Sequence, residues 1–193
     1  MCVILDDKLL FSQQITKICN SLSKVHGIMY SVAKFLTRDA RLTLYYSIAY
    51  SQLIQSIVIW GGATDDRINP IKVKMNNILR TILNVKRDLN NIPMMHVIDM
   101  YECLEILQYH DVYNYFLLKF VRDAQYCNYA VFDRYYSHLL PQHNHNTRHS
   151  RFNIPSVRLE IEKHFTVYKS VIIYNAIPCK LLAPMCADTF KKK

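Results

Sequence analysis

Two adjacent aspartates, Asp6 and Asp7, follow the apolar pair Ile4-Leu5 near the start of the sequence. Paired carboxylates can bind the two metal ions of nucleotidyl transfer, which lie roughly 3.5–4 Å apart. That chemistry needs carboxylates that converge from separate strands, and only five residues precede Asp6. We therefore interpret Asp6-Asp7 as an acidic turn and predict no catalytic residue in this sequence.

A second group of candidate residues is the histidine cluster His143, His145 and His149. Neutral imidazoles are good zinc ligands, but the segment is polar and the nearest preceding cysteine, Cys127, is distant in sequence. We predict no metal site here. His145 and Arg148 either contact RNA or anchor the loop by hydrogen bonds, and the sequence leaves both alternatives open.

The third group lies between Arg67 and Arg87, where six residues are basic and none is acidic. The pair Asn69-Pro70 predicts the start of a helix, with an N-cap followed by proline at the first helical position. Apolar residues at intervals of three and four residues then predict one buried stripe. Basic side chains on the opposite face would bind phosphates without reading bases, although an ordinary solvated face fits the same pattern. The candidate binding residues are Lys72, Lys74, Asn76, Arg80, Lys86 and Arg87.

Composition limits the classes of protein that fit. The 193 residues include 24 Lys and Arg against 15 Asp and Glu, a net charge of +9, and the excess is spread along the chain. Such an excess suits a nucleic-acid partner. The six scattered cysteines predict reduced thiols in an intracellular protein of the nucleus or cytoplasm. Uninterrupted apolar runs are too short to span a membrane, and three glycines leave no glycine-rich phosphate loop.

Helical periodicity dominates the sequence. A strand is expected within residues 1–11, an extended or partly ordered link over about 124–156, and a β-hairpin from about 156, where Val157, Leu159 and Ile161 alternate. The central part predicts helices. The first helix is expected from Ser12 to about Met29. The second runs from Arg38 towards Tyr50, with Thr37 as its N-cap and an extension to Trp60. Three more are expected, one from about Asn69, a short one after Pro93, and one over about 103–122.

The order of motifs resembles the end of a non-LTR retrotransposon reverse transcriptase. The matching segments are "VILDDKLLFSQQI", "LSKVHGIMYSVAKFL", "LTLYYSIAYSQLIQSIVIWGGA", "KMNNILRTILNV", "HNTR", "IPSVR" and "YNAIPCKL", and together they cover nearly the whole chain. The sequence departs from the family at Gln14, where histidine is frequent, and at Tyr174, where tryptophan is.

This resemblance implies a mainly α fold: a helical, thumb-like bundle with a short N-terminal β remnant and a C-terminal β-hairpin. It divides the chain into a palm-end strand and helix (1–36), a helical thumb-like domain (37–123), and an irregular link with the hairpin (124–193). In the family, Asp6-Asp7 matches a hairpin turn of the palm, and the metal-binding aspartates lie upstream. The parent enzyme would be a Mg²⁺-dependent RNA-directed DNA polymerase, whereas this chain would have no catalytic site and no cofactor.

The expected partners are RNA, RNA–DNA duplex, and the missing palm and fingers of the parent polymerase, with no membrane. Two alternatives remain at this point. In the first, the chain is a helical protein-interaction module whose basic excess only aids solubility; in the second, it is a truncated, non-functional relic.

Overall fold

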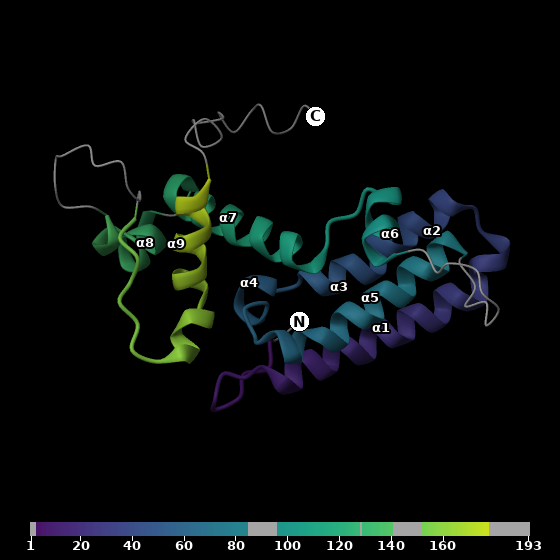
Figure 1. Cartoon of the computed structure of the whole chain (residues 1–193), viewed down its shortest axis with the longest axis horizontal. Coiled ribbons are helices and arrows are strands. Elements are labelled where there is room, and N and C mark those ends of the chain that lie inside the picture. The colour runs from purple at the N-terminus through teal and green to yellow at the C-terminus, as the bar shows by residue number, and fades with distance from the viewer. Residues whose placement is uncertain (1–2, 85–95, 128, 141–151, 178–193) are drawn as a thin grey trace. The chain divides into compact units, whose positions relative to one another are not determined.

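A computed structural model describes residues 3–84, 96–127, 129–140 and 152–177 (Figure 1). The described residues are mainly helical and include no strand, which confirms the mainly α prediction. The chain divides into two compact units, unit 1 with residues 1–116 and unit 2 with residues 117–193.

Helices α1 (Ser12–Val32) and α5 (Asp65–Leu83) form the centre of unit 1 and lie side by side (Figure 1). Each buries apolar side chains at alternating intervals of three and four residues, the heptad spacing of coiled-coil seams. These side chains are Ile15, Ile18, Leu22, Val25 and Met29 on α1, and Ile68, Ile71, Met75, Ile78 and Ile82 on α5. The apolar stripes predicted from the sequence are therefore confirmed as core.

The two helices run parallel. The Arg67 side chain donates a hydrogen bond to Ser12 Oγ at one end, and His26 Nε2 lies 3.1 Å from Thr81 Oγ1 near the other. Both pairs join residues 55 positions apart in the sequence. A constant offset along the length of two helices means that they share one direction and one register.

Between α1 and α5, the chain continues through η1 (Ala33–Phe35), α2 (Arg38–Leu44), the π-helical turn η2 (Tyr45–Tyr50), α3 (Ser51–Ile54) and α4 (Ile57–Trp60). Thr37 caps α2, as predicted, by accepting a hydrogen bond from the Ala40 N–H. Ser56 adopts positive φ and separates α3 from α4. Trp60 is fully buried, and its indole N–H donates to the Gln55 carbonyl at 2.9 Å.

Helix α6 (Val97–Cys103) and the first part of α7 (Tyr109–Cys127) complete unit 1. The His96 side chain caps α6 by accepting a hydrogen bond from the Ile98 N–H at 3.4 Å. Tyr109 contacts the turn after α4, where its hydroxyl donates to the Gly61 carbonyl at 3.1 Å. The helix predicted over 103–122 thus begins later, at Tyr109.

Two other predictions about unit 1 are wrong. Residues 3–11 form no strand, because the Ile4 N–H donates to the Gln14 side chain of α1 instead of pairing with a neighbouring strand. Helix α5 begins at Asp65 with Thr64 as N-cap, so Pro70 lies inside the helix. The earlier start buries Ile68 in the same stripe as the later apolar residues, which outweighs the local signal of Asn69-Pro70.

Unit 2 contains the end of α7, α8 (Tyr129–Tyr135), η3 (Ser137–Leu139), η4 (Glu160–His164) and α9 (Thr166–Ala176). Its core contains four aromatic rings, Phe132, Tyr136, Phe152 and Tyr174, each with its centroid about 6 Å or less from that of another, together with Val121, Leu139 and Val171. The Asn175 side chain accepts from the Phe152 N–H at 3.1 Å and donates to the Phe152 carbonyl at 2.9 Å. Asn175 thereby ties α9 to the segment before it.

The segment predicted to form the β-hairpin contains no strand over its described residues, 156–177. Ile161 lies in η4, and Val171 and Tyr174, three residues apart, face the core from α9. The helical spacing of apolar residues in α9 therefore determines the structure here, and the short alternation of Val157, Leu159 and Ile161 does not produce a strand. The predicted link over 124–156 is also partly helical, since α7 reaches Cys127 and α8 follows. The hairpin from residue 178 onward and the link over 141–151 lie outside the described residues.

Candidate nucleic-acid interface

The acidic turn before α1 is held by its own aspartate. The Asp6 carboxylate accepts the Phe11 N–H at 3.0 Å, and the Asp6 carbonyl accepts the Leu9 N–H at 2.9 Å. Leu9 and Phe11 both adopt positive φ, which the turn requires. Asp6 thus has a structural role in the turn. Within the described ranges, no three His, Cys, Asp or Glu side chains gather in a way that could hold a metal ion.

Lys72 and Asn76 lie on the flank of α5 that contacts α6 and α7. The Lys72 ammonium is 3.2 Å from the Asp65 carboxylate and 2.7 Å from His110 Nε2. The Asn76 side-chain oxygen accepts from the Tyr101 hydroxyl at 3.0 Å. Burial raises the pKa of Tyr101 to about 12, so this hydroxyl keeps its proton at neutral pH. Both candidate residues therefore make contacts inside unit 1.

Arg80 lies close to the outer face of α5, beside Asn77. Its guanidinium donates to the Asn77 side-chain oxygen at 3.0 Å, while its Nε is buried and has no hydrogen-bond partner within the described part of the chain. The predicted stripe of Lys72, Asn76 and Arg80 is half-buried along its length and is not an open basic face.

Lys74 lies on the other flank of α5, towards α1. It is two residues from Lys72, a rotation of about 200° around the helix axis, so the two lysines do not share a face. Burial raises the pKa of the Cys19 thiol, and the charge on Lys74 opposes this shift. Burial and Lys74 both lower the pKa of His26. These effects place the Lys74 charge near the middle of α1.

We define the α1–α5 rim as Ser12, Cys19 and His26 of α1 with Arg67, Lys74 and Thr81 of α5. Each set is spaced by seven residues, so the rim follows the heptad register along one side of the helix pair. Arg41 of α2 extends it by donating to the Thr81 carbonyl at 3.0 Å. Exposed Thr16 of α1, four residues after Ser12, lies next to it, and so does half-buried Asn77 of α5, three residues after Lys74.

Sequence analysis missed the contribution of α1 to this surface. The sequence does contain a sign of this contribution. No acidic residue occurs from Lys8 to Arg38, whereas the same stretch includes Lys17, Lys24 and Lys34. What the sequence does not reveal is that this acid-free stretch packs beside the one that begins at Arg67. Four other predicted binding residues, Lys86, Arg87, His145 and Arg148, lie outside the described residues, as does the histidine cluster.

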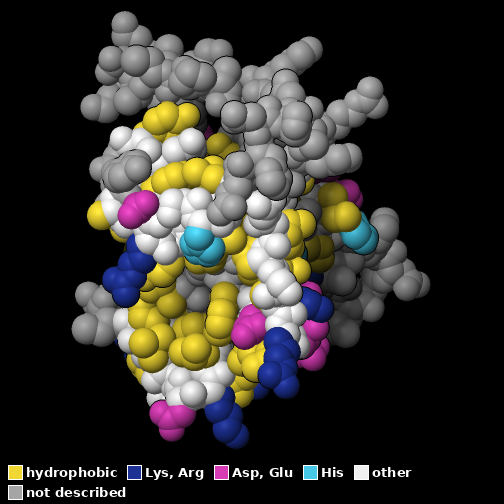
Figure 2. All heavy atoms as spheres, turned by 90° about the vertical axis from the view of Figure 1, so that its left-hand side faces the viewer, with side chains coloured by type: hydrophobic (Ala, Val, Ile, Leu, Met, Phe, Trp, Pro, Cys, Tyr) yellow, Lys and Arg dark blue, Asp and Glu magenta, His cyan; other side chains and the backbone are white. Residues whose placement is uncertain are grey.

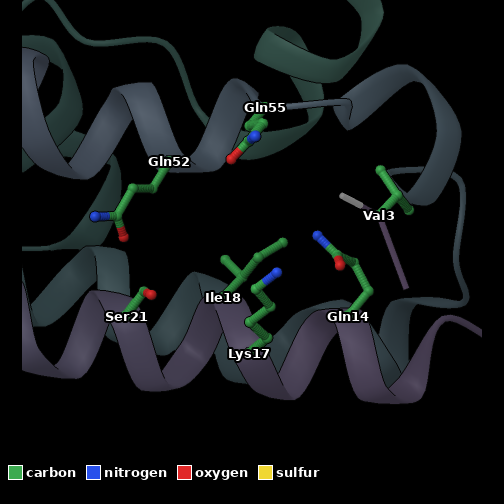
Figure 3. A pocket seen from close by; sticks show the side chains of 7 residues that line it. All are labelled: Val3, Gln14, Lys17, Ile18, Ser21, Gln52 and Gln55. Atoms are coloured by element: carbon green, nitrogen blue, oxygen red, sulfur yellow. The ribbon is translucent and has the colours of Figure 1, made fainter. Parts of the chain in front are cut away.

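One small cavity lies between the N-terminal segment, α1 and the residues around the end of α3 (Figure 3). Its lining consists of Val3, Gln14, Lys17, Ile18, Ser21, Gln52 and Gln55. Its volume of about 20 Å³ is enough for a water molecule and not for a larger ligand. The buried Gln52 side-chain oxygen, which has no partner in the described part of unit 1, is a group that such a water would satisfy.

No protein-family model, no curated protein and no solved structure matches this chain. No helix in the described ranges is long and apolar enough to cross a membrane.

Proposed function

We propose that this chain binds nucleic acid through the α1–α5 rim and the exposed side chains next to it, and that RNA–DNA duplex is its ligand. One observation carries the proposal: two parallel, adjacent helices come from stretches, 8–38 and 67–87, that contain no acidic residue. The only acidic residues on either helix are Asp65 and Asp66 in the first turn of α5. A surface with one sign of charge attracts the phosphate backbone and raises the association rate.

The contacts available on this surface suit phosphate and sugar. Arg67 and Lys74 supply positive charge, and Thr16 and Asn77 supply a hydroxyl and an amide group. Side chains of these types bind the nucleic-acid backbone without reading its sequence. We therefore expect affinity that varies little with base sequence and falls steeply with salt. Lys72 and Asn76, which are engaged inside unit 1, would contribute less than the sequence predicts.

In biological terms we propose the role that the resemblance implies, that of the C-terminal part of a non-LTR retrotransposon reverse transcriptase that holds the template–primer. The catalytic Mg²⁺ and its aspartates would belong to the palm of the parent polymerase. Support for a non-catalytic role comes from Asp6, whose carboxylate holds a backbone turn. We expect the purified chain to show no magnesium-dependent primer extension. Incorporation that is abolished by Asp6→Asn would contradict this role.

A salt titration of binding tests the proposed surface. Fluorescence anisotropy would measure the affinity of the chain for a labelled RNA–DNA hybrid over a range of salt concentrations. Arg67→Gln with Lys74→Gln should lower affinity, and should reduce the slope of log affinity against log salt by roughly 0.9 for each lost phosphate contact. Lys119→Gln, at an exposed position of α7 in unit 2, is the matched control and should change neither value.

A helical protein-interaction module is the second candidate, and exposed apolar side chains favour it. Figure 2 shows hydrophobic side chains on one face among charges of both signs. In unit 2, Ile154, Leu159, Phe165 and Ile172 are among the exposed apolar residues. Absent hybrid binding at low salt, or binding that the double variant of Arg67 and Lys74 leaves unchanged, would favour this function over nucleic-acid binding.

A further inference from the structure

Two aromatic side chains at the end of α1 are unusually exposed. Tyr30 is 74% exposed and Phe35, in η1, is 76% exposed, the two highest values among the large hydrophobic residues that the structure describes. Most other aromatic residues of unit 1 are at least half-buried. Rings with this exposure contribute little to the core of unit 1, and their faces are accessible to a ligand.

Positive charge lies beside the Phe35 ring. The Lys34 ammonium lies 4.7 Å from the centroid of the Phe35 ring, and the His26 and Tyr30 rings are 6.4 Å apart. His26, Tyr30 and Lys34 follow at intervals of four residues, which places them along one side of the helical segment. The segment belongs to the acid-free stretch 8–38, and His26 is part of the α1–α5 rim.

We propose that Tyr30 and Phe35 form a stacking site for unpaired bases of a nucleic acid whose duplex part lies on the α1–α5 rim. This inference rests on the proposed function and adds a second class of ligand to it, a single-stranded segment next to the duplex. Every base has a flat π face, so aromatic stacking tolerates any sequence, and a nearby lysine binds the phosphate that each stacked base carries. The absence of acidic residues from stretch 8–38, to which both rings belong, favours a polyanion as the ligand.

The test compares an RNA–DNA hybrid with blunt ends and the same hybrid with a short single-stranded overhang. Wild-type protein should bind the overhang substrate more tightly. In the double variant Tyr30→Leu with Phe35→Leu, affinity for the overhang substrate should fall by at least about fivefold, the lower range for loss of one stacked base. Affinity for the blunt hybrid should stay unchanged. Leucine keeps an apolar side chain and removes the ring, so the variant separates stacking from general apolar contact.

Two control variants accompany this measurement. Tyr30→Phe with Phe35→Tyr keeps both rings and should retain the preference for the overhang, and Tyr126→Leu removes an exposed ring of α7 in unit 2 and should also retain it. A 2-aminopurine base in the overhang should lose fluorescence on binding to wild type and not to the leucine variant.

The outcomes separate the two proposals. Blunt-hybrid binding without any gain from the overhang, or a gain that the leucine variant preserves, overturns the stacking site and leaves the duplex proposal standing. Preserved binding in the leucine variant would also indicate that the exposed patch serves apolar contacts. Absence of binding to both substrates overturns both proposals.

Discussion

At the scale of single residues, Gly61 has the most constrained environment. A Cβ atom added to it would lie 2.4 Å from the Ile57 carbonyl oxygen and 2.6 Å from Cδ2 of Tyr113. Its own carbonyl accepts the buried Tyr109 hydroxyl. Neither the backbone of α4 nor the Tyr113 ring of α7 can move without disturbing the packing of Trp60 and its neighbours. Glycine at this position is therefore a requirement of packing between α4 and α7.

We predict that Gly61→Ala lowers the free energy of unfolding of unit 1 by about 1–3 kcal/mol, the usual cost of overpacking. Denaturant titration followed by Trp60 fluorescence would measure this, because the chain has a single tryptophan. Gly27→Ala is the matched control. Nothing lies within 4 Å of a Cβ at Gly27, so alanine in the middle of α1 should stabilise by about 0.5–1 kcal/mol. Equal effects of the two substitutions would contradict the clash.

His26 makes the stability of unit 1 depend on pH. Burial and the nearby Lys74 lower the pKa of His26 below its ordinary value of 6.5. The unfolded chain therefore takes up the proton more readily than the folded chain, and stability that is present above pH 6.5 declines as pH falls through this value. His26→Gln, which can still bond to Thr81, should reduce this decline. Unfolding titrations between pH 7.5 and 5, compared for wild type and variant, measure the difference, and parallel curves would contradict the prediction.

At the scale of secondary structure, the parallel pair of α1 and α5 explains most of unit 1. Its two matching apolar stripes face each other, and its rim is polar and basic. The arrangement fixes which lysines remain accessible, because Lys72 turns towards α7 and Lys74 towards α1. Function and stability thus depend on the rotation of α5 about its own axis.

Truncation of the stripe should destabilise unit 1 strongly. Ile78→Ala removes a fully buried side chain and should lower the free energy of unfolding by about 2–5 kcal/mol. Val73→Ala, on the exposed face of the same helix, should change it by about 0.5 kcal/mol or less. Thermal unfolding followed by circular dichroism would distinguish the two variants. A large effect at Val73 would show that the outer face of α5 is covered.

The sequence predicted the helices better than their surfaces. The heptad spacing of α1 and α5 is strong because many positions agree, so both stripes were found. The start of α5 was misplaced because Asn69-Pro70 is a good local signal, while the burial of Ile68 is a tertiary effect. The hairpin was predicted from a short alternation, whereas the helical placement of Val171 and Tyr174 depends on a core that only the folded chain defines. Which basic side chains of α5 stay accessible depends on where α1, α6 and α7 pack against it. The spacing of residues along the sequence does not give those positions.

At the scale of the whole molecule, the chain consists of two units with cores of different character. The core of unit 1 is mainly aliphatic and follows a helical register, whereas aromatic residues make up half of the buried core cluster of unit 2. In unit 2, the Tyr136 hydroxyl and Ser170 Oγ, both buried, are 2.9 Å apart, and the Tyr174 hydroxyl donates to Gln125. Polar ends of aromatic residues are thus satisfied inside unit 2.

The Asn175 side chain should be essential to unit 2. Asn175→Ala leaves the N–H and carbonyl of buried Phe152 without their partner, a loss of about 1–3 kcal/mol. Hydrogen–deuterium exchange should accelerate in peptides from 152 to 177, while peptides from α1 and α5 keep their protection. Ala176→Ser, at the exposed neighbouring position of α9, is the control. Unchanged exchange in the Asn175 variant would contradict this role.

The shared direction of α1 and α5 also has a consequence for how the chain folds. Partners across this helix pair are 55 residues apart, so no short loop can bring them together. Loop-closure entropy must be overcome before any of these contacts forms, and helical proteins with such distant partners fold more slowly than bundles built from adjacent hairpins. During synthesis, α1 emerges before α5, and the part of its apolar stripe that α5 covers stays exposed until α5 has left the ribosome.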